Sequence, residues 1–161
     1  MRRAERATHH RTFPADLLPS AVFGGFDSIN GLVGLMVGLL AGHASTRAIV
    51  TVVLAAGAAN SVSMSGGEMV SDVVGSTRDR WLRCLTMGGV FLVVSLAPPV
   101  GFLFSRSAGV VTMLALTPLV LVGITSVRAR FHGWWQATLT VGAIFALAAV
   151  TAYGAALLGA G

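Results

Sequence analysis

The chain has 161 residues, of which 55% are hydrophobic and only 11% are charged, and its formal net charge at pH 7 is +5. About a quarter of the residues of a soluble domain are charged, so this composition excludes an ordinary soluble domain. The basic residues are all arginine and lie before the first apolar segment or in the links between segments, which argues against a nucleic-acid partner. We therefore expect an all-α membrane protein whose main partner is the lipid bilayer.

Five apolar segments are long enough to cross the ~30 Å hydrocarbon core of a bilayer as helices. They cover residues 21–42, 48–72, 84–104, 108–127 and 134–158. Prolines in residues 1–20 favour non-helical structure there, so we expect a cytoplasmic tail over 1–20. The remaining residues, 21–161, form one five-helix transmembrane domain. The single cysteine, Cys84, excludes an intramolecular disulfide, and we expect it to be a small buried hydrophobe.

The arginines predict the orientation of the chain. They gather in the tail, in the link between the second and third spans, and in the link between the fourth and fifth spans. Only Arg47 and Arg106 lie in the other two links. By the positive-inside rule, the N-terminus lies in the cytoplasm and the C-terminus outside. The arginine-only, Ala/Gly/Val-rich composition suggests a bacterial plasma membrane, whereas a eukaryotic chain would belong in a vacuolar-type membrane.

The first span carries a carboxylate, Asp27, well inside its apolar segment. Asp27, Asn30, Gly34 and Gly38 recur at steps of three and four, so they share one helix face. Glycines four residues apart let two helix backbones approach closely. The pattern leaves two interpretations open. The glycines either pack within one chain or make a symmetric contact with a second copy, in which case Asp27 lines a shared path.

The second span ends in a polar segment, NSVSMSGGEMVSD. Asn60, Met64, Glu68 and Asp72 recur there at steps of four and form one polar stripe. Ionisable groups inside a membrane are costly and are read as functional by default. Because the turn between the first two spans is short, an antiparallel hairpin sets Asp27 and Met64 at one depth, with the two acidic residues of the stripe nearer the cytoplasm.

The last three spans are predicted to form a scaffold. Pro98 and Pro99 lie inside the third span and should interrupt its helix. The fourth and fifth spans carry no ionisable group in their apolar cores. Trp134 and Trp135 begin the fifth span, where indole rings commonly anchor a helix at the membrane interface.

The polar residues of the first two spans favour a cation. Carboxylate and amide oxygens alone suit Mg²⁺ or Ca²⁺, and a thioether shifts the preference toward Fe²⁺, Mn²⁺ or Co²⁺. These stripes contain no His or Cys, which argues against a tight zinc site. Metal binding to a protonated carboxylate releases the proton, so metal–proton exchange has a direct mechanism. The six candidate metal ligands are Asp27, Asn30, Asn60, Met64, Glu68 and Asp72.

Other function classes remain as alternatives. A passive divalent cation channel would use the same residues without moving protons. A membrane metal sensor or scaffold would bind a metal or a partner without transporting anything. An enzyme is not expected, because the sequence shows no nucleophile–base pair, phosphate loop or cofactor motif. We expect no tightly bound cofactor.

Two segments carry a family resemblance. VFGGFDSINGLVGLMVGLLAG in the first span resembles the first helix of the vacuolar iron transporter family, and SMSGGEMVS looks like the corresponding part of its second helix. The resemblance implies a homodimer whose first helices line a path at their interface, with proton-coupled export of Fe²⁺ or Mn²⁺ from the cytosol. Asp27, Met64 and Glu68 match the acidic and methionine positions of the family motifs.

The chain departs from that family at three places. Ser28 stands where the family has glycine after the aspartate, and Ala56 stands where plant-type members have a glutamate. Many members insert a long acidic metal-binding domain between the second and third spans, whereas residues 73–83 form only a short link here. The chain therefore resembles the short, nodulin-like branch that lacks this domain.

Overall fold

The structure, a computed structural model, describes residues 13–71 and 76–159. Its elements are α1 (Phe13–Ala41), α2 (Thr46–Ser71), α3 (Thr77–Leu96), the 3₁₀ helix η1 (Pro98–Leu103), α4 (Arg106–His132) and α5 (Trp134–Gly159). Within these described ranges, five helical segments are long and apolar enough to cross a membrane. The predicted all-helical class and the five membrane-length segments are confirmed.

The start of α1 differs from the prediction. The helix begins at Phe13 and continues through Pro19, so the assignment of residues 13–20 to a non-helical tail was wrong. Pro14 lies in the first turn, where the backbone N–H has no partner within the helix and its loss costs little. Pro19 does remove one backbone bond. The next residue, Ser20, is buried against the bundle, so packing holds the helix through this position.

The ends of the other helices follow from capping residues and prolines. The Ser76 side chain accepts a hydrogen bond from the Asp79 backbone N–H and begins α3. Pro98 and Pro99 have no N–H to donate, so α3 ends at Leu96 and the chain continues as η1 with both prolines buried. The predicted break in the third span is therefore present.

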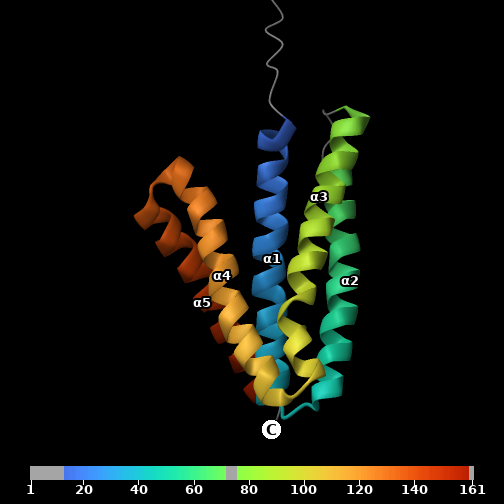
Figure 1. The fold of residues 1–161 in the computed structure, drawn as a ribbon, viewed down its shortest axis with the longest axis vertical. Coiled ribbons are helices and arrows are strands. Elements are labelled where there is room, and N and C mark those ends of the chain that lie inside the picture. The colour runs from blue at the N-terminus through green and yellow to red at the C-terminus, as the bar shows by residue number, and fades with distance from the viewer. Residues whose placement is uncertain (1–12, 72–75, 160–161) are drawn as a thin grey trace, which may run out of the picture.

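Helix α1 is central to the arrangement, because it packs against each of α2, α3, α4 and α5. Helix α2 packs mainly on α3, and α4 pairs with α5. Figure 1 shows α1, α2 and α3 running side by side, while the α4–α5 pair leans away from α1 toward the end at which α1 begins. The buried apolar core joins all of the first four helices and η1, and consists of Ile29, Leu32, Val33, Met36, Ile49, Val53, Phe91, Phe102 and Met113.

Small residues bring α1 and α2 close to α3. The Ser28 hydroxyl donates to the Phe91 carbonyl oxygen at 3.0 Å, and the Ser61 hydroxyl donates to the Gly88 carbonyl oxygen at 2.8 Å. A Cβ atom at Gly24 would lie only 2.5 Å from the backbone oxygen of Met87. These contacts allow backbone-to-backbone approach, which is the usual basis of helix association in membranes.

At the opposite end of the bundle, Arg106 links the start of α4 to the end of α1 and the turn after it. Its guanidinium donates to the carbonyl oxygens of Leu40 at 3.2 Å and Ala44 at 3.0 Å. These carbonyls lie at the end of α1 and in the turn that follows it, where the helix dipole favours a cation. The start of α4 is thereby tied to the turn between α1 and α2.

Gly24→Ala should destabilise the fold by roughly 1–3 kcal/mol, because the added Cβ would meet a backbone atom of α3 that cannot rotate away. Thermal unfolding in detergent micelles, followed by circular dichroism, measures the effect. Gly89→Ala is the matched control, since no atom lies within 4 Å of its Cβ position and alanine favours the helix. Equal melting temperatures for the two variants would contradict the close approach of α1 to α3.

Candidate functional site

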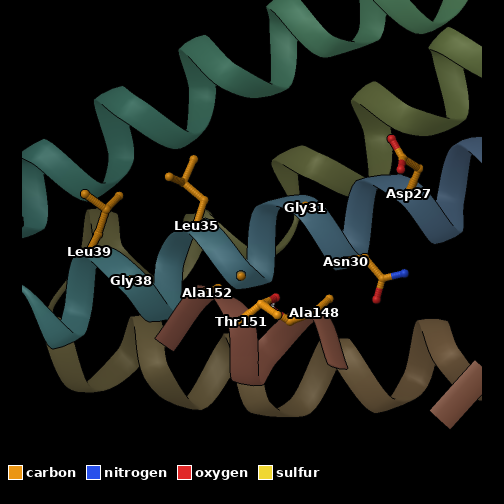
Figure 2. Close-up of a pocket in the computed structure, with 10 residues that line it drawn as sticks. Asp27, Asn30, Gly31, Leu35, Gly38, Leu39, Ala148, Thr151 and Ala152 are labelled. Carbon is orange, nitrogen blue, oxygen red and sulfur yellow. Dashed lines mark hydrogen bonds between the residues drawn. The ribbon is translucent and has the colours of Figure 1, made fainter. Parts of the chain in front are cut away.

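An open groove with a volume of about 750 Å³ runs along α1. Residues of α1 form its floor, and Ala148, Thr151 and Ala152 of α5 form one wall (Figure 2). Its polar side chains are Asp27, Asn30 and Thr151. In Figure 2, Asn30 points toward α5 and Asp27 points to the other side of α1. The groove therefore combines a carboxylate and an amide with a glycine-rich helix surface.

The two polar residues of α1 in this groove lack partners within the described residues. Asp27 is exposed and makes no hydrogen bond or ion pair with any of them. The Asn30 Oδ1 atom is buried and accepts no hydrogen bond. Buried polar atoms nearly always have a partner, and an unsatisfied one costs about 1–3 kcal/mol. An acceptor oxygen and a carboxylate that line one groove without protein partners are groups that a cation or its hydration water could satisfy.

Glu68 belongs to a different group of side chains. Its carboxylate accepts a hydrogen bond from the Ser20 hydroxyl at 3.2 Å and lies 3.7 Å from the Arg83 Nε atom. Both members of the ion pair are partly buried, so screening by solvent is weaker than at a free surface. A cation that binds Glu68 must therefore compete with the Arg83 guanidinium.

The remaining candidate ligands are dispersed. Met64 packs against the hydrophobic core, and Asn60 is exposed on α2. Asp72 lies outside the described residues. Within the described ranges, no group of three or more His, Cys, Asp or Glu side chains is arranged to hold a metal ion. The structure thus brings Asp27 and Asn30 to one groove and leaves Glu68 with Ser20 and Arg83.

The relative depths of α1 and α2 follow from their bonds to α3. Ser28 of α1 and Ser61 of α2 bond to carbonyls at positions 91 and 88 of α3, three residues apart. Counted along the helices at 1.5 Å per residue, Ser61 lies nearer than Met64 to the depth of Asp27. Met64 lies about one turn, or ~5 Å, further than Ser61 toward the end of the bundle at which α1 begins. Asp27 and Met64 therefore do not share one depth as expected, because Met64 is displaced toward the start of α1.

Several residues of these surroundings were not singled out in the sequence. Ser20 and Arg83 contact Glu68, although Arg83 was interpreted only as a topological arginine. The α5 wall of the groove was also missed. Its alanines, Ala148 and Ala152, are four residues apart, and this small-residue spacing is the signal that could have identified the wall.

The glycines of α1 are compatible with both interpretations that the sequence left open, packing within one chain and contact with a second copy. A Cβ at Gly34 would lie 3.3 Å from the Ala152 Cβ, so this glycine packs within the chain against α5. A Cβ at Gly31 would have no neighbour within 4 Å, and Gly38 lines the open groove. Part of the glycine face is therefore occupied and part is free.

Comparison with known protein families and with curated proteins returned no match for this chain. The resemblance carried by the first two spans therefore stays a prediction.

Asn30→Ala should leave the metal-free protein as stable as the parent or raise its stability by up to about 1 kcal/mol, because the change removes a buried acceptor that has no partner. Thermal unfolding in detergent with a divalent-metal chelator tests this expectation. Asn60→Ala serves as the control, since this amide is exposed. A clear loss of stability in Asn30→Ala alone would show that the Asn30 oxygen has a partner within the protein.

Proposed function

We propose that this protein exports Fe²⁺ or Mn²⁺ from the cytosol through the membrane in exchange for protons. The observation that carries the proposal is that Asp27 and Asn30 line one groove on a helix long and apolar enough to span a membrane, and that neither the Asp27 carboxylate nor the Asn30 Oδ1 atom has a partner among the described residues. Such groups are costly in a bilayer unless they line a pathway or bind an ion. The resemblance of the first two spans to the vacuolar iron transporter family supports the same function.

The proposed path has its ligands in sequence along the bundle axis. Glu68 receives the ion at the cytoplasmic end, assisted by Asp72. Met64 lies about one turn further along, and its flexible side chain can leave the apolar core to offer a thioether. Asp27 and Asn30 bind the ion next, with Asn60 assisting at their depth. A succession of weak sites suits transport, because the ion must also leave.

In this proposal the protein is a homodimer joined along α1, with each N-terminus in the cytoplasm. The groove is open along α1, and in a single chain its carboxylate would face the bilayer. A second copy would cover it, and the open space at Gly31, in the groove that Gly38 also lines, leaves room for a helix to approach. The orientation rests on the distribution of the arginines.

Asp27→Asn should abolish metal transport, because the amide keeps the size of the side chain but loses the charge that binds the ion and exchanges the proton. The measurement is Fe²⁺ or Mn²⁺ flux into sealed proteoliposomes, with and without an imposed pH gradient. Asp79→Asn is the matched control, since Asp79 is exposed at the start of α3 and contacts Ser76. It should retain the parental flux.

The same assay separates the alternatives. Flux that is lost in Asp27→Asn but does not respond to the pH gradient would indicate a passive channel and not an antiporter. The absence of Fe²⁺, Mn²⁺ or Co²⁺ flux by the folded parent protein would indicate a sensor or scaffold. Full flux in Asp27→Asn would exclude the proposed site.

Gly31→Cys in a Cys84→Ser background should form a disulfide or short thiol cross-link between two chains in the membrane. The new side chain has no neighbour within 4 Å and faces the groove that the proposal assigns to the second copy. Gly123→Cys is the control, because this glycine of α4 also has open space around it but lies outside the groove. Equal cross-linking of both variants at dilute protein would contradict a dimer along α1.

A further inference from the structure

A second hollow lies between the first part of α1 and the α4–α5 pair, where Figure 1 shows the pair leaning away from α1. This cleft has a volume of about 540 Å³, which is within the range of sites for small molecules. Its lining is mainly apolar, with Phe23 and Phe26 from α1, Ile124 from α4 and Ile144 from α5 among its residues. It is separate from the groove that contains Asp27.

Arg128 gives the apolar cleft a polar end. Arg128 and Thr140 also line an adjoining hollow of about 300 Å³, to which Gln136 contributes. The apolar cleft and the polar hollow therefore meet at Arg128, which lines both. Arg128 is exposed and makes no hydrogen bond or ion pair with another residue in the described part of the chain.

The depth of Arg128 matches the level of lipid headgroups. It lies two residues before the end of the fourth membrane-length segment, Arg106–Arg130. The next helix begins with Trp134 and Trp135, both exposed, as is typical of side chains at the membrane–water interface. Basic hollows between membrane helices at this depth are suited to anionic headgroups.

We propose that this cleft binds one anionic phospholipid. The acyl chain lies between α1 and the α4–α5 pair, and the headgroup phosphate accepts hydrogen bonds from Arg128 and Gln136. The guanidinium has the fork geometry that binds phosphate oxygens in pairs, and the binding is strengthened by opposite charge. The site is independent of the metal path and does not rest on the proposed transport function.

Charge argues against two other occupants. The residues before α1 carry four arginines against one carboxylate, Glu5, so their net positive charge opposes binding at Arg128. A second copy would have to offer a carboxylate. Among the carboxylates at this end whose side chains the structure describes, Glu68 contacts Ser20 and Arg83, and the exposed Asp79 contacts Ser76. A phospholipid supplies an anion and an apolar chain together, which is what the two joined hollows require.

The test is native mass spectrometry of the purified full chain, titrated with phosphatidylglycerol or phosphatidylcholine that carry the same acyl chains. The parent protein should bind one phosphatidylglycerol about fivefold more tightly than phosphatidylcholine, as expected for one arginine near a membrane surface. Arg128→Gln should remove this preference. Arg130→Gln should keep it, because Arg130 lies on the same helix but lines neither hollow.

A second variant tests the apolar part of the site. Ile144→Trp fills the cleft without changing the charge, and it should lower the binding of phosphatidylglycerol while leaving melting temperature and circular dichroism unchanged. Unaltered binding in this variant would overturn the placement of the acyl chain.

Three further outcomes would overturn the proposal. Equal lipid preference in Arg128→Gln and Arg130→Gln would show that the guanidinium does not select the headgroup. Full displacement of phosphatidylglycerol by millimolar inorganic phosphate would make the polar hollow a site for a free anion. Conversion of a dimer into a monomer by Arg128→Gln would assign the cleft to a second copy.

Discussion

The close approach of α1 and α2 to α3 is the constraint on which the rest of the structure depends. Gly24 allows the backbones of α1 and α3 to touch, and the hydroxyls of Ser28 and Ser61 bond to carbonyl oxygens of α3. In an apolar environment such bonds matter, because no water replaces the partner of a buried hydroxyl. One face of α1 is thereby committed to α3. The face that carries Asp27 and Asn30 is consequently turned to the open groove.

This division of faces explains why the polar residues fall into separate groups. Glu68 is held beside Ser20 and Arg83, Met64 is packed with the core, and Asp27 and Asn30 lie in the groove. A single shell of protein ligands would favour tight and permanent binding. Groups that are separated along the axis suit the stepwise passage of an ion instead. In the proposed path, the pairing of Glu68 with Arg83 would add an electrostatic barrier at the first step.

The α4–α5 pair gives the molecule a second kind of surface. At one end, hydrogen bonds from Arg106 join this pair to the end of α1 and the turn after it. Along α5, Ala152 packs against Gly34 of α1. Toward the other end the pair leans away (Figure 1). The apolar cleft, which has Arg128 among its lining residues, lies there. The two hollows differ in chemistry, since one presents a carboxyl group and the other a guanidinium, each without a partner among the described residues. They are therefore suited to partners of opposite charge.

The sequence by itself determined the features that depend on local composition. Five membrane-length helices follow from the lengths of the apolar segments, the break after α3 follows from Pro98 and Pro99, and the burial of Cys84 follows from its apolar character. The stripe of Asp27 and Asn30 was also visible, because residues three apart on a helix share a face. The tertiary structure decided what depends on contacts between helices. It set the register of α1 against α2, paired Glu68 with Arg83, supplied the α5 wall of the groove and carried α1 back to Phe13. The periodicity of one helix cannot specify which glycine of its neighbour meets which carbonyl, and that choice fixes depth and rotation for every side chain on both helices.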